Sequence, residues 1–201
     1  NSSPVLTREQ AFDRINGERV YQDGKLGKEW EHKGFPSIGA ELTMLRKYMS
    51  DIERTWTTTY GDPTEKDSLN LLRQFAAMAV RTMENYGCPA HGETDESQRK
   101  KRKVESSEMK GSAPRTEPVL TRRQAFDVVD SERKHQEKSW PYQPEMTTEF
   151  TIIRDLLNKA DAAYAAAYGV EVMEIIRAIA ATATRTIENF GCPERLLKKA
   201  D

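Results

Sequence analysis

The stretch Pro4-Val-Leu-Thr-Arg-Glu-Gln-Ala-Phe-Asp13 decides the fold, because it returns with one change as Pro118-Val-Leu-Thr-Arg-Arg-Gln-Ala-Phe-Asp127. The similarity continues beyond it, and 12 of the 19 residues in 4–22 are identical to their partners in 118–136. Self-similarity at a fixed spacing is the signature of a duplicated structural unit. The chain is therefore predicted to contain two copies of one small domain.

A second pair of matching blocks marks the end of each copy. Residues 73–89 match 177–193 at 11 of 17 positions. With 201 residues, the chain has room for two small domains. We predict a first helical repeat at 1–90 and a second at 118–201.

The segment between the copies, 91–117, is rich in Gly, Ser, Glu, Lys and Arg and almost free of apolar residues. Such a composition cannot bury enough surface to offset the entropy of ordering. It predicts a flexible charged linker. The basic string Arg99-Lys-Lys-Arg-Lys-Val104 inside it is similar to a nuclear-localisation signal, but such strings arise by chance in charged linkers, and we interpret it as fortuitous.

Each copy is predicted to contain three helices. Thr7 and Thr121 each begin a Thr-x-x-Gln capping box, which is typical of a helix N-terminus. Apolar residues then recur at three- and four-residue steps, and no alternating stretch supports a strand. In the first copy the second and third helices are expected at about 37–59 and 64–86. The predicted fold is all-α, with the two three-helix copies packing on each other as a pseudo-dimer bundle.

Composition excludes several classes of function. The 31 basic and 32 acidic residues nearly cancel, giving a net charge of -1, whereas proteins that bind duplex nucleic acid present a strongly basic face. No run of apolar residues is long enough to span a membrane, and the first residues lack the pattern of a secretory signal. We expect a protein of the cytoplasm of a bacterial host cell. Its two cysteines, Cys88 and Cys192, are expected to be reduced, the alternative being one bridge that clamps the copies together.

The candidate ligand-binding residues are polar side chains that both copies keep. Arginine offers a planar, bidentate donor fork that suits phosphate, and alanines lie between the arginines of the third helix. The predicted set comprises Arg19, Gln22, Arg73, Arg81 and Glu84 in the first copy and Arg133, Gln136, Arg177, Arg185 and Glu188 in the second. The alternative is that these arginines and glutamates form ion pairs between helices.

Two tryptophans, Trp30 and Trp140, follow the first predicted helix in each copy. Either a nucleotide base stacks on them, or they cap the small core. The histidines and cysteines show no metal-ligand spacing, and no catalytic motif is present. No catalytic residue, metal site or cofactor is predicted.

The pattern Phe12-x-x-Ile-x-x-Glu-Arg-x-x-Gln22, followed by Glu41-Leu, Arg73 and Met83-Glu84, resembles small phage-encoded helical proteins. Some of these are described as MazG-like, after the all-α nucleotide pyrophosphohydrolases. Enzymes of that type bind Mg²⁺ through ExxE and ExxD motifs on neighbouring helices. Here Met44 and Gly87 stand where the second carboxylate of each motif would be expected, so the resemblance implies that catalysis has been lost or was never present.

Three functions remain open. The first is binding or sequestering a phosphorylated nucleotide, for example a cyclic immune signal, at the interface between copies, as a phage counter-defence protein would do. The second is a protein–protein interaction module, such as a phage scaffold or an inhibitor of a host protein. The third is a Mg²⁺-dependent NTP pyrophosphohydrolase that uses Glu41, Glu84 or Glu171. Self-association through the repeat interface is expected in each case.

Overall fold

The computed structural model describes residues 5–33, 35–58, 65–92, 118–140, 144–167 and 169–195, and within these ranges the side chains of 26–33, 65 and 66 are excluded. Most of the predicted linker and its basic string lie outside the described residues. The first copy contributes α1 (Arg8–Lys33), α2 (Ile38–Thr58) and α3 (Glu65–Tyr86). The second contributes α5 (Arg122–Ser139), α6 (Met146–Ala165) and α7 (Gly169–Phe190). All regular structure in these ranges is α-helical, which confirms the predicted fold class.

The helices start where their caps predict. Thr121 accepts a hydrogen bond from the backbone N–H of Gln124, and the Gln124 side chain accepts one from the Thr121 backbone, which completes a capping box. Thr7 and Gln10 form the same reciprocal pair at the start of α1, at 2.8 and 3.2 Å. These bonds satisfy amide groups that would otherwise lack partners in the first turn.

The third helix of each copy stops at a glycine. Gly87 and Gly191 have φ angles of +75° and +78°, and each donates its N–H to a carbonyl four residues earlier. This left-handed conformation suits glycine because a Cβ would be strained there. The third helix of the first copy ends at Tyr86, as predicted, and α7 ends at the equivalent Phe190.

The first helix departs from the prediction in one copy. Trp140 follows α5 as expected, because Pro141 disfavours helical geometry in the residue before it. Trp30 does not follow α1, since that helix runs on to Lys33. After Trp30 the first copy has no proline until Pro36, so nothing comparable stops α1 at the tryptophan.

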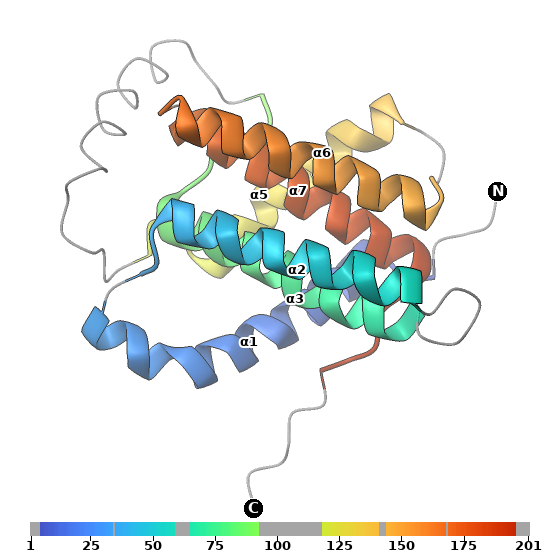
Figure 1. The fold of residues 1–201 in the computed structure, drawn as a ribbon, viewed down its shortest axis with the longest axis horizontal. Coiled ribbons are helices and arrows are strands. Elements are labelled where there is room, and N and C mark those ends of the chain that lie inside the picture. Colours follow the sequence, from blue (N-terminus) through green and yellow to red (C-terminus); the bar gives the residue numbers. More distant parts are fainter. Residues whose placement is uncertain are drawn as a thin grey trace, which may run out of the picture.

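The helices pack in three layers. The central layer pairs α3 with α7; α2 and α6 lie on one side of it, and α1 and α5 pack on the other. Figure 1 shows α2, α3, α6 and α7 running alongside one another, with α1 lying beside them. The alanine-rich stretches of α3 and α7 are fully buried in these two central helices. The small side chains that the sequence suggested would admit a phosphate thus lie in the helices that pack on each other.

The leading segment of each copy, the residues just before its first helix (5–7 and 118–121), contacts the other copy. The backbone N–H of Leu6 donates to the Glu188 carbonyl at 2.9 Å, and that of Leu120 donates to the Glu84 carbonyl at 2.9 Å. These carbonyls lie in the last turn of α7 and α3, where no intrahelical donor follows. The leading segments therefore cap the central helices of the opposite copy.

The outer helices are linked across the copies as well. Arg154 of α6 lies 3.3 Å from Glu53 of α2, and Arg46 of α2 pairs with Asp161 of α6. Both arginines are about half exposed, so these pairs contribute little stability. The described residues include no helix long and apolar enough to cross a membrane.

Candidate functional site

The predicted ligand residues Arg81 and Arg185 lie inside the bundle. Arg81 donates to Glu41 at 2.6 Å, and Arg185 donates to both carboxylate oxygens of Glu149 at 2.7 and 2.8 Å. Both glutamates are fully buried. Each pair ties the third helix of a copy to its second helix.

Burial raises the pKa of Glu41 and of Glu149 above the usual value for a glutamate, and the neighbouring Arg81 and Arg185 act in the opposite direction. Burial dominates because removing a carboxylate from water disfavours its charged form. A buried ion pair of this kind adds little net stability, but removing one partner leaves the other charge uncompensated. Removal of either the arginine or the glutamate of a pair is therefore expected to destabilise the bundle.

A second pair of predicted residues, Arg73 and Arg177, connects the third helix to the first. The Nε atom of Arg73 lies 3.3 Å from Glu18, and that of Arg177 lies 2.9 Å from Glu132. All four side chains are exposed by less than a tenth. Glu18 and Glu132 lie on the buried face of the first helix of each copy, and their pairing with an arginine explains how a charged residue occupies a core position there.

The same two arginines reach into the other copy. The Nη1 atom of Arg177 donates to the Pro89 carbonyl at 2.6 Å, and Nη1 of Arg73 donates to the Pro193 carbonyl. Each guanidinium thus joins a glutamate of its own copy to the segment that follows the third helix of its neighbour. Charged donors make the stronger class of hydrogen bonds.

The remaining predicted residues form a third set of buried contacts. Arg19 donates to Glu84 at 2.6 Å and to the Gln22 side chain at 3.2 Å. The second copy repeats both contacts, at 2.7 and 3.3 Å, with Arg133, Glu188 and Gln136. All ten predicted residues are therefore buried, and every arginine among them is paired with a glutamate.

The carboxylates named for a Mg²⁺ site do not converge. Glu41 and Glu84 are each paired with an arginine, as described above, while Glu171 is exposed in the first turn of α7. Within the described ranges, His, Cys, Asp and Glu form no group of three or more with metal-binding geometry.

The two thiols are not joined. Cys88 is buried and lies 3.2 Å from the Met173 carbonyl of the other copy, while Cys192 is partly buried. Burial raises the pKa of Cys192 to about 11. The bridge considered from the sequence is absent from the structure, and Cys192 is a weakly reactive thiol because the thiolate is the reactive form.

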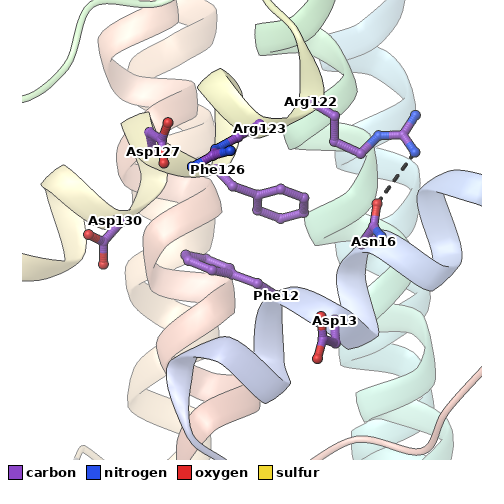
Figure 2. Close-up of a pocket in the computed structure, with 8 residues that line it drawn as sticks. All are labelled: Phe12, Asp13, Asn16, Arg122, Arg123, Phe126, Asp127 and Asp130. Atoms are coloured by element: carbon purple, nitrogen blue, oxygen red, sulfur yellow. Dashed lines mark hydrogen bonds between the residues drawn. The ribbon is translucent and has the colours of Figure 1, made fainter.

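A pocket of about 500 Å³ opens between α1 and α5, where the two copies face each other. Phe12 and Phe126 contribute one ring each, and their centroids are 4.9 Å apart. Figure 2 shows both rings pointing into the space between the helices. The two phenylalanines are equivalent residues of the repeat, so the pocket lies where the copies meet.

Part of the charge around this pocket is already neutralised. Arg122 lies 3.0 Å from Glu84, pairs with Asp23 and donates to Asn16 at 3.4 Å. A lining carboxylate, Asp130, is bound in the same way by two cations from outside the pocket lining. These groups shape the wall without offering a net charge to a ligand.

The rest of the charge is open. Arg123, Asp13 and Asp127 line the pocket and are exposed, and none of them forms an ion pair with any residue that the structure describes. An exposed guanidinium beside two phenylalanine rings can hold an anionic group. The two carboxylates can accept hydrogen bonds from hydroxyl groups.

The candidate residues predicted from the sequence did not include Phe12, Phe126 or Arg123. Arg123 is a position where the copies differ, since Glu9 occupies it in the first copy. A search restricted to residues that both copies keep therefore passes over it. The signal available in the sequence was the charge reversal itself, inside an otherwise identical ten-residue block.

The sequence matches no known protein-family model, and no curated protein or solved structure shows significant similarity to it.

Proposed function

We propose that the chain binds a small phosphorylated nucleotide, without converting it, in the pocket between α1 and α5. The observation that supports this is the combination of two phenylalanine rings, Phe12 and Phe126, with the exposed guanidinium of Arg123 in one pocket of about 500 Å³. Ligand pockets usually have volumes of about 300–1,000 Å³. The pocket is large enough for a nucleotide.

Each part of a nucleotide has a complementary group in this pocket. A base can stack on the phenylalanine rings, an interaction that tolerates any base because each has a π-face. Arg123 suits the phosphate through its bidentate fork. Asp13 and Asp127 suit the ribose hydroxyls, a role that carboxylates play in dinucleotide-binding folds.

The balance of charge limits the ligand. Arg122 and Asp130 are neutralised by their partners, which leaves one cation, Arg123, beside the carboxylates Asp13 and Asp127. A triphosphate would bring several negative charges close to two carboxylates, which repel it. We therefore expect a nucleotide with one phosphate to bind more tightly than a nucleoside triphosphate.

The architecture that supports this pocket is a pseudo-dimer. Equivalent contacts occur in both directions: each leading segment caps the opposite central helix, and each of Arg73 and Arg177 donates to the carbonyl of the proline that follows the other copy's third helix. A pair related in this way buries the same patch twice. In the proposal, the approximate two-fold axis that relates the copies passes near Phe12 and Phe126, so the ligand is held between the copies.

The test is calorimetric titration of the full chain with AMP, ATP and a cyclic nucleotide, with chromatography of the nucleotide afterwards. Arg123→Gln is expected to weaken AMP binding by about tenfold, or about 1.4 kcal/mol. Lys138→Gln is the matched control, since Lys138 is an exposed cation on the same helix and outside the pocket lining. AMP recovered intact would accord with a binding protein.

Two results would contradict the proposal. Conversion of the nucleotide would indicate the pyrophosphohydrolase. No binding by any nucleotide would favour the protein-interaction module, whose test is stable co-purification with a host or phage protein.

A further inference from the structure

A second cavity, of about 320 Å³, lies within the second copy between α5, α6 and α7. Its floor includes Ala178 and Thr182 of α7. The equivalent positions of α3 carry Gln74 and Met78, whose side chains are much larger. Met78 is almost completely buried. The cavity therefore lies where the second copy has smaller side chains than the first copy has at the equivalent positions.

The α6 wall shows the same difference. Leu156 lines the cavity, and its counterpart in α2 is Tyr48. Tyr48 packs against the core of the first copy, where burial raises its pKa. Three positions thus change from large to small between copies, in one place, without any change in the pattern of buried ion pairs.

An aromatic ring closes one side of this cavity. Trp140 is the residue that ends α5, and its backbone N–H donates to the Gln136 carbonyl at 2.7 Å. The residue is 45% exposed. The guanidinium of Arg185 lies 5.4 Å from its ring centroid, within the range of a cation–π contact. The indole is held in place by the bundle, yet presents a surface on which a planar ring can stack.

The charges at the mouth are arranged differently in the two copies. In α2, Lys47 and Asp51 are one turn apart and 3.1 Å from each other. In α6 the same positions carry Asp155 and Lys159, which line the cavity and form no ion pair with the described residues. In the first copy the two charges neutralise each other, whereas in the second copy neither forms an ion pair with a described residue.

The polar groups deeper in the cavity are occupied. Gln136 donates to the Thr182 hydroxyl at 3.3 Å and accepts from Arg133, while Glu132 is paired with Arg177. The interior therefore has no open charge for a ligand to neutralise. What remains open is a largely apolar, aromatic-walled space lined by the carboxylate of Asp155, the ammonium group of Lys159 and the exposed ring of His135.

From this geometry we infer a second binding site, in the second copy alone, for a small aromatic molecule that carries adjacent ammonium and carboxylate groups, the chemistry of an aromatic amino acid. The ring stacks on Trp140 and packs on Leu156. The ligand's ammonium group binds Asp155, and its carboxylate binds Lys159. This site is independent of the nucleotide pocket between α1 and α5.

The experiment is calorimetric titration of the full chain with L-phenylalanine and with two analogues that each lack one charge, 3-phenylpropionate and 2-phenylethylamine. Phenylalanine is expected to bind, and each analogue is expected to bind at least about tenfold more weakly. Asp155→Asn should weaken phenylalanine more than it weakens phenylpropionate, which has no ammonium group. Equal affinities for all three compounds, or no binding of phenylalanine, would overturn the inference.

The first copy supplies the matched control. Ala178→Gln with Thr182→Met fills the cavity with the residues that the first copy tolerates at these positions, and it should abolish phenylalanine binding while circular dichroism still reports a folded helical protein. Lys159→Gln, an exposed change that leaves the core intact, gives a second reading if the filled variant does not fold. Arg123→Gln should leave phenylalanine binding unchanged. Retention of phenylalanine binding by a folded, filled variant would show that the cavity is not the site.

Discussion

The two copies agree in their buried ion pairs and differ at several positions that line the two pockets. Both hold three arginine–glutamate pairs in the same positions, for example Arg81 with Glu41 and Arg185 with Glu149. Each pocket, in contrast, includes a position at which the copies differ: Arg123 stands where the first copy has Glu9, and Ala178 stands where it has Gln74. The buried polar residues that both halves keep thus maintain the fold, and a comparison restricted to kept residues overlooks positions such as Arg123 and Ala178.

The largest expected effect follows from removing one member of a buried pair. Arg185→Ala leaves Glu149 fully buried without its bidentate partner, which is expected to cost about 3–5 kcal/mol of unfolding free energy. Arg81→Ala should also be destabilising, because it leaves the fully buried Glu41 without the guanidinium that donates to it at 2.6 Å. Urea unfolding followed by circular dichroism measures both variants. Equal and small losses would show that these arginines do not hold the helices together.

The next effect tests the exchanged leading segments. A Cβ added at Gly87 would lie 2.9 Å from Val119, and one added at Gly191 would lie 3.1 Å from Val5, so each glycine contacts the leading segment of the other copy. With the positive φ, alanine at either position is expected to cost about 1–3 kcal/mol, more at Gly87. Thermal unfolding of Gly87→Ala, alone and with Val119→Ala, separates the two causes. If the second change restores nothing, the crossing contact is not formed.

A smaller change concerns binding rather than stability. Arg123→Glu gives the second copy the residue that the first copy carries at this position, so the start of α5 should fold normally. Its expected effect is a loss of AMP affinity of at least about tenfold. Calorimetry with Arg123→Glu and wild-type protein checks this. Unchanged affinity would show that the charge reversal between copies has no part in binding.

The smallest effect concerns Cys192. Because burial raises its pKa from 9.0 to about 11, the folded state holds the proton more tightly than the unfolded state. The resulting stability is present below about pH 9 and is lost as the pH rises toward 11. Alkylation by iodoacetamide should therefore be slow at pH 8 and rise with pH into this range. Mass spectrometry locates the label, with Cys192→Ser as the control, and a rapid reaction at pH 8 would contradict the assigned burial.

Much of the fold was predictable because local signals specify it. The capping boxes at Thr7 and Thr121 and the glycine stops at Gly87 and Gly191 give helix ends directly from residue type. The extension of α1 beyond Trp30 was missed because the sequence comparison assumed equal first helices. Nothing local to the first copy required α1 to stop there.

The candidate sites were harder to predict, because they depend on how helices from distant parts of the chain are placed. Phe12 and Phe126 carry the same pattern as any core residue, and only the approach of α1 to α5 makes them a pocket. The kept arginines carried a signal that fits either a phosphate site or ion pairs, since both uses need the same side chain. Only the position of Glu41 and Glu149 relative to them distinguishes these two uses.

The most direct test of the central claim is a double-mutant cycle on Arg185 and Glu149, measured by urea unfolding. If the pair is structural, each single change to leucine should be strongly destabilising, and the double change should recover most of the loss because no charge is left buried alone. Because each single change is expected to cost about 3–5 kcal/mol and the double change much less than the sum, the account predicts a coupling free energy of more than about 3 kcal/mol between the two residues. Single variants as stable as the wild-type protein, but unable to bind AMP, would contradict it and return Arg185 to a ligand site.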